Sequence, residues 1–205
     1  MSEARHPGLD RLAEVMHAIR SGCPWDAGQT HASLVTYLVE ETAEVVEAIE
    51  AGDDVDLREE LGDLLLQVFF HAEIAAEEGR FDIDDVAGQI ADKLERRHPY
   101  VFSDADVPDD LNAFWERRKK AEKGRRSALD GIPGPLATLA RASKVVSRAR
   151  THGVGVPLPD EPIDADAVGR GVLALVARAQ ASGVDADQAT RAALRALEEG
   201  LRASE

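Results

Sequence analysis

Two pairs of carboxylates, separated by a short polar turn, define the chemistry that this sequence can support. Glu41 and Glu44 are three residues apart, as are Glu60 and Asp63, so each pair lies on one face of a helix. The intervening residues 52–54, Gly-Asp-Asp, are typical of a turn between antiparallel helices, which would direct both pairs into one space. Carboxylates gathered in this way repel one another unless divalent cations neutralise them. The sequence therefore predicts a site for Mg²⁺, with Mn²⁺ as a substitute, ligated by these four residues.

The helix predicted for residues 54–79 is apolar on nearly every side. Leu61 lies on one apolar stripe, whereas Phe70 lies on the opposite side, around Asp63. A helix of this kind is expected inside its assembly, and carboxylates held there require hydrogen bonds, cationic partners or a metal. A solvated acidic face is the simpler interpretation of any single glutamate, but it does not explain acids among apolar neighbours. The same apolar surface predicts self-association of the chain.

Further motifs accompany the carboxylates, and together they resemble the MazG family of nucleoside triphosphate pyrophosphohydrolases over roughly residues 8–150. The motifs are Gly22-Cys23-Pro24-Trp25-Asp26, Glu40-Glu41-x-x-Glu44, Glu60-x-x-Asp63, Asp92-Lys93-Leu94-Glu95-Arg96-Arg97-His98-Pro99 and Val101-Phe102, followed by Trp115 and Lys119. The resemblance implies hydrolysis of (deoxy)nucleoside triphosphates to a nucleoside monophosphate and pyrophosphate. It also implies a homodimer. Normal and oxidised nucleotides are both compatible with these residues.

Two cations and one further carboxylate have candidate roles beside the metal. Lys93 and Arg97, four residues apart, fall next to the apolar stripe of their helix, where they either extend to the rim or meet triphosphate oxygens. They would then stabilise charge on the pyrophosphate leaving group. Glu40, on the flank of the acidic cluster, is a candidate for orienting or deprotonating the attacking water.

Two tryptophans and a lysine are candidate contacts for the nucleotide. Trp25 either fills a hydrophobic gap or, as its proline-containing loop and the family resemblance favour, shapes or stacks on the nucleoside. The resemblance also suggests that Trp115 and Lys119 close over the nucleotide. From composition alone, residues 117–123 are a solvated basic run.

Length and composition favour a cytoplasmic all-α protein. The 205 residues are 44% hydrophobic and poor in aromatics, which suits an antiparallel helical bundle. The single cysteine, Cys23, excludes an internal disulfide framework, and no apolar run is long enough to suggest a membrane span. A formal charge of −15 disfavours binding to nucleic acid or anionic membranes. Helical spacing and chain breaks predict helices at 8–20, 30–51, 54–79, 83–98 and 136–150.

The last 55 residues are interpreted as a separate, non-catalytic segment. Residues 1–150 form the expected catalytic helical domain, and residues 151–205 are expected to hold a linker and a degenerate second helical repeat. Residues 168–176 align with residues 61–69, but Arg170 stands in the place of Asp63. The repeat would therefore serve packing or dimerisation. Chance similarity between alanine- and leucine-rich helices is the alternative.

Two other functions compete with hydrolysis. Glu14-x-x-His17 and Glu95-x-x-His98 match part of the ligand pattern of di-iron carboxylate bundles, although Glu14, His17 and Glu95 lie far from the apolar stripes of their helices. A catalytically silent nucleotide-binding or regulatory protein on the same bundle is the second alternative. Saturable binding without turnover would identify it.

Overall fold

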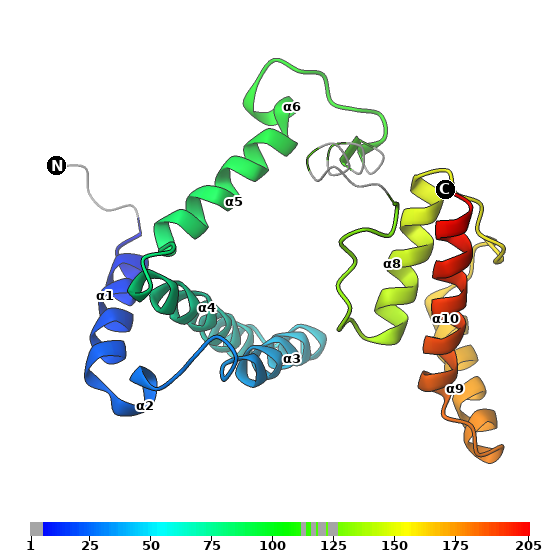
Figure 1. Ribbon diagram of the computed structural model, residues 1–205, viewed down its shortest axis with the longest axis horizontal. Coiled ribbons are helices and arrows are strands. Elements are labelled where there is room, and N and C mark those ends of the chain that lie inside the picture. Colours follow the sequence, from blue (N-terminus) through cyan, green and yellow to red (C-terminus); the bar gives the residue numbers. More distant parts are fainter. Residues whose placement is uncertain (1–5, 112–113, 116–117, 119–121, 123–126) are drawn as a thin grey trace. The chain divides into compact units, whose positions relative to one another are not determined.

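The computed structural model describes residues 6–111, 114, 115, 118, 122 and 127–205. Throughout this described part, every regular element is a helix, so the predicted all-α fold class is confirmed (Figure 1). None of the described helices is both long and apolar enough to span a membrane. The chain divides into two compact units, Met1–Ala105 and Asp106–Glu205.

The first unit holds the elements that carry the acidic pairs. Its helices are α1 (Pro7–Gly22), α2 (Pro24–Ala27), α3 (Val35–Ala51), α4 (Asp54–Glu77), α5 (Ile83–Arg97) and α6 (Pro99–Phe102). The third of these begins at Val35, five residues later than predicted, because the backbone from Thr30 to Leu34 is turned rather than helical. The other predicted ranges in this unit agree with the structure to within a few residues.

The α3–α4 hairpin is formed by two residues with opposite roles. Gly52 ends α3 in the left-handed conformation, with φ +70°, and its N–H donates to carbonyls of the last turn. Asp53 is the N-cap residue of α4, because its side chain accepts hydrogen bonds from the N–H groups of Val55 and Asp56. The short connection places the two helices side by side and antiparallel (Figure 1).

We expect two glycine substitutions in this unit to change stability in opposite directions. Gly52→Ala should destabilise the protein by about 1–2 kcal/mol, because an L side chain is strained at positive φ. Gly88→Ala, within α5, should stabilise it by about 0.5–1 kcal/mol, since a methyl group there meets no atom within 4 Å. Urea unfolding of both variants measures the difference. Equal destabilisation by both would contradict the role of Gly52.

The core of the first unit lies where α1 and the segment before α3 meet the C-terminal half of α4. Its buried members are Met16, Leu34, Phe69, Phe70 and Ile74. The N-terminal half of α4 is less covered, and Val55 and Leu61 are exposed within the single chain. The expectation that α4 is enclosed on every side is therefore not met by this chain alone, because α1, α3 and α5 cover only part of its surface.

The second unit has its own core. Its long helices are α8 (Thr138–Thr151), α9 (Ala165–Ala181) and α10 (Ala186–Ala203). Val145 and Ala149 of α8 pack with Leu194 and Leu201 of α10. These contacts explain why the structural division falls between residues 105 and 106, whereas the sequence analysis placed a boundary at residue 150.

The α4–α5 and α9–α10 connections share a local design. Gly79 and Gly183 both have positive φ, and the N–H of the next residue donates to a carbonyl five residues earlier in each case. Asp82 and Asp185 then cap the following helices, after a connection that is one residue shorter in the second unit. The proposed second repeat remains a prediction, and this likeness is consistent with it.

Candidate metal and nucleotide site

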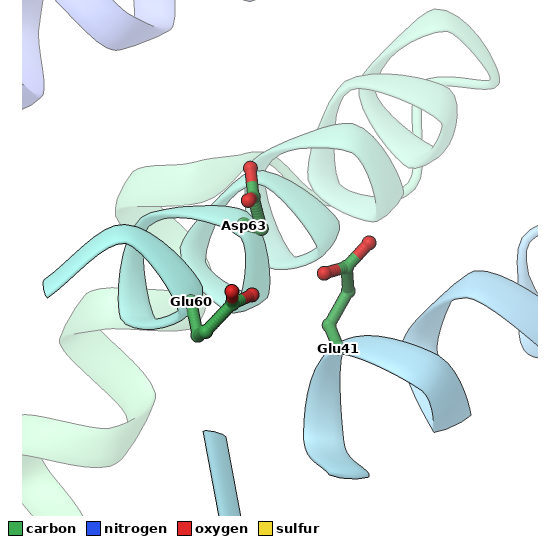
Figure 2. Close-up of side chains that lie close together, drawn as sticks. All are labelled: Glu41, Glu60 and Asp63. Carbon is green, nitrogen blue, oxygen red and sulfur yellow. The ribbon is translucent and has the colours of Figure 1, made fainter. Parts of the chain in front are cut away.

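Three of the four predicted ligands converge across the α3–α4 hairpin. Glu41 projects from α3 toward Glu60 and Asp63 on α4, and one oxygen from each carboxylate lies within 4.8 Å of the others (Figure 2). All three residues are half-buried. Among the described residues, this is the group of three or more acids, histidines and cysteines with a geometry suited to one metal ion.

The electrostatics of the cluster favour a bound cation. Burial, followed by the negative charges of Asp63 and Glu44, raises the pKa of Glu41. Burial, followed by the charges of Glu44 and Asp63, likewise raises the pKa of Glu60. Glu44 is exposed, yet its negative charge contributes to the raised pKa of both Glu41 and Glu60. All four predicted ligands therefore interact, and their hard oxygen donors suit a divalent cation such as Mg²⁺ or Mn²⁺.

A cavity of about 320 Å³ adjoins the cluster and extends its acidic surface. It is lined by Glu44, Glu47, Ala48, Ala51, Asp56 and Glu60. Sequence reasoning did not single out Glu47 and Asp56, although each lies three or four residues from a predicted ligand, on the same helix face. Glu40 is exposed on α3, next to Glu41, and its role toward water remains a prediction.

An aromatic pair connects α2 to α3, the helix that carries Glu41. Trp25 is 52% exposed and meets Tyr37 edge to face, with ring centroids 5.9 Å apart. Trp25 is therefore not an interior plug. Tyr37 precedes Glu41 by four residues on α3, so the two side chains share a helix face. Sequence reasoning missed Tyr37 because its contact with Trp25 is tertiary.

Three of the remaining residues predicted to contact the nucleotide lie within the described part of the chain. Lys93 and Arg97 are half-buried and one turn apart on α5, which packs against α4. Trp115 is half-buried in the second unit, and Lys119 lies outside the described residues. Their roles toward the nucleotide remain predictions.

The structure gives the two histidines of the di-iron pattern other partners. The Nδ1 atom of His17 lies 2.6 Å from a carboxylate oxygen of Glu73 on α4, whereas Glu14 is exposed on α1. His98 directs Nδ1 at the carbonyl of Leu94, 2.7 Å away. Both histidines thus make structural contacts away from the acidic cluster.

A chain of hydrogen bonds links Arg80, His31 and His71 in the first unit. An arginine only donates, so Arg80 donates to Nε2 of His31 at 2.6 Å. Nδ1 of His31 then carries the proton and donates to Nδ1 of His71 at 2.7 Å. The two rings stack, with centroids 5.0 Å apart. Each ring therefore offers one nitrogen as an acceptor, Nε2 in His31 and Nδ1 in His71.

We expect His71 to make stability depend on pH. Burial, followed by the charge of neighbouring His31, lowers the pKa of His71 below 6.5. The unfolded chain thus binds this proton more readily, so the stabilisation is full above about pH 6.5 and declines as pH falls through the folded pKa. Melting temperatures between pH 7.5 and 5 should decline more steeply in the native protein than in His71→Gln. Parallel curves would contradict this assignment.

Comparison with known proteins identifies relatives of this chain. Residues 29–102 match the family model of the MazG nucleotide pyrophosphohydrolase domain. An uncharacterized 26.1 kDa protein in the blaB 3' region of Streptomyces cacaoi is 48% identical over 199 residues, covering 95% of this chain and 81% of that protein. A nucleoside triphosphate pyrophosphohydrolase of Escherichia coli K12 is 49% identical over 153 residues, covering 71% of this chain. This chain spans 58% of the length of that enzyme.

The crystal structure of a mazG-related protein from Thermotoga maritima aligns with a TM-score of 0.48 and 28% identity, covering 54% of this chain and 98% of that one. The family model defines the class of residues 29–102, a nucleotide pyrophosphohydrolase domain, and every regular element in this stretch is a helix. The chain belongs to the MazG family, and the resemblance seen in its acidic motifs is confirmed.

Proposed function

We propose that this protein hydrolyses nucleoside triphosphates, with ribose or deoxyribose, to the monophosphate and pyrophosphate in a Mg²⁺-dependent reaction. The convergence of Glu41, Glu60 and Asp63 within 4.8 Å is the observation that carries the proposal. Family membership supports the reaction type. The raised pKa values of Glu41 and Glu60, caused chiefly by burial, support a cation as the natural partner of the cluster.

Residues of the first unit bind the metal and orient the attacking water in this reaction. Glu41, Glu44, Glu60 and Asp63 hold the metal, which when bound polarises phosphoryl oxygens and lowers the pKa of a water. Glu40, on the same helix, orients that water or accepts its proton. Positioning and charge stabilisation account for most catalysis of phosphoryl transfer, so no covalent nucleophile is required.

The remaining predicted residues bind the substrate. Lys93 and Arg97 meet the triphosphate and stabilise charge on the departing pyrophosphate. Trp25 stacks on the nucleoside, and its contact with Tyr37, one turn from Glu41, supports this placement. Trp115 and Lys119 are assigned to the nucleotide by family resemblance alone. Stacking accepts any base, so a broad range of normal or oxidised nucleotides fits this arrangement.

We also propose that the chain functions as a homodimer in the cytoplasm. Large apolar side chains are exposed on α3, α4 and α5, including Val39, Ile49, Leu61 and Leu94. Covering them in a second copy would remove apolar surface from water. The mass of the purified protein in solution, measured by light scattering, tests the dimer.

The decisive experiment measures pyrophosphate release from a panel of normal and oxidised nucleoside triphosphates, with chromatographic identification of the products. Activity should require a divalent cation and return when Mg²⁺ is added after chelation. Mg²⁺ alone should also raise the melting temperature, because it binds only the folded cluster. Nucleotide binding without turnover across all metals and bases would instead identify a silent binding protein.

A further inference from the structure

Arg20 is a nearly buried cation that connects the end of α4 to the segment carrying Trp25. It lies in the last turn of α1 and is 8% exposed. Its Nε and Nη2 atoms donate to the two carboxylate oxygens of Glu77, at 2.8 and 2.9 Å. The guanidinium also lies 5.9 Å from the ring centroid of Phe70. A charge this buried is held in place by its partners.

The remaining nitrogen of Arg20 donates hydrogen bonds to the segment that follows α1. Nη1 donates to the backbone carbonyl of Asp26 and, at 3.0 Å, to that of Gln29. The side chain of Gln29 in turn donates to the carbonyl of Trp25 at 3.0 Å. Each of these bonds ends on a backbone carbonyl, so together they constrain the path of the chain from Trp25 to Gln29 rather than the identity of its side chains.

We infer that Arg20 is a positioning residue for nucleoside binding, acting through Trp25. The Trp25 side chain is largely exposed and is supported by Tyr37, so its own packing provides little rigidity. The anchor acts on the backbone, and Arg20 supplies it from the last turn of α1 while it binds Glu77 at the end of α4. The inference rests on the proposed function, in which Trp25 stacks on the nucleoside. An aromatic ring that is already held in place loses less conformational entropy when the nucleoside binds.

The geometry predicts that lysine cannot make the same contacts as this arginine. One planar guanidinium donates to Glu77 through two nitrogens and to the 26–29 segment through the third. The ammonium group of lysine is a compact point charge that cannot span both partners at once. Arg20→Lys therefore keeps the charge beside Glu77 and releases the backbone around Trp25.

The second unit supplies a matched control. Arg141 donates through Nε and Nη2 to both oxygens of Glu198, at 2.8 and 2.9 Å, and through Nη1 to the carbonyl of Pro133 at 2.9 Å. Arg141→Lys thus removes the same fork from a part-buried arginine of the second unit, whereas the residues of the acidic cluster belong to the first unit. A loss of stability alone should affect both variants, whereas release of Trp25 should follow only Arg20→Lys.

The test combines a signal from Trp25 with steady-state kinetics. The chain has two tryptophans, so in a Trp115→Phe background the nucleotide-free fluorescence anisotropy reports Trp25 alone. Arg20→Lys should lower this anisotropy, and Arg141→Lys should not. In the native background, Arg20→Lys should raise KM for a nucleoside triphosphate roughly tenfold while kcat changes much less, since a misplaced contact weakens binding.

The outcomes separate this inference from the proposed function. Absence of pyrophosphate release by the native protein would refute the proposed function, while the anisotropy measurement would still test the anchor. Unchanged anisotropy in Arg20→Lys, or an equal fall in Arg141→Lys, would overturn the role of Arg20. A fall in anisotropy with unchanged KM in the active enzyme would overturn its link to nucleoside binding. Glu77→Gln, which weakens the same anchor at an exposed carboxylate, provides the check if Arg20→Lys folds poorly.

Discussion

Asp63→Asn should lower the rate of pyrophosphate release by at least about a hundredfold at saturating nucleotide and Mg²⁺. The substitution keeps the size of the side chain but removes a negative charge from the group in which Asp63 faces Glu41 and Glu60. Helical content, measured by circular dichroism, should remain unchanged, because the residue is only half-buried and belongs to no core cluster. The loss would therefore be chemical rather than structural.

The same variant should respond differently to metal. Without Mg²⁺ its melting temperature should equal or exceed that of the native protein, because the charge of Asp63 raises the pKa of Glu41 and Glu60 by repulsion. The rise in melting temperature on adding Mg²⁺ should shrink. Glu50→Gln, on the exposed side of α3, is the matched control and should leave both activity and metal response unchanged. Activity near the native level in Asp63→Asn would remove the cluster from the mechanism.

Ending the chain at Val154 should unfold α8 while leaving the metal response of the first unit intact. Val145 and Ala149 of α8 are 0% exposed because Leu194 and Leu201 of α10 pack against them. Each large apolar side chain buried in this way contributes on the order of 1.5–3 kcal/mol. Hydrogen exchange should show unprotected amides in α8 but protected amides in α4. Continued protection of α8 would show that it does not depend on α10.

Two point variants test the same contacts without truncation. Leu201→Ala, at a position 3% exposed, should destabilise the second unit by about 2–5 kcal/mol. Leu173→Ala, on α9 and 70% exposed, should change stability little. Urea unfolding monitored by hydrogen exchange in α8 and α10 distinguishes them. Similar destabilisation by both variants would mean that the α8–α10 packing is not what stabilises this unit.

Local spacing was sufficient to predict the helices and the acidic pairs. The three-residue offset of Glu60 and Asp63 places both on one helix face whatever surrounds them, because it follows from the helical repeat alone. Gly52 and Asp53 determine the turn through contacts with residues close to them in the sequence. The hairpin that brings Glu41 opposite Glu60 and Asp63 could therefore also be predicted from the sequence. Family resemblance added the reaction type, which spacing by itself does not specify.

Tertiary packing decided the features that depend on residues distant in the chain. Arg20 and Glu77 are separated by 57 positions, and no periodicity links them. Tyr37 became a candidate only through its contact with Trp25, and α8 joined the second unit only through its packing with α10. A sequence records which faces are apolar or charged. Which faces meet depends on how the helices pack, and this packing brought Arg20 of α1 into contact with Glu77 of α4 and with the backbone that follows Trp25.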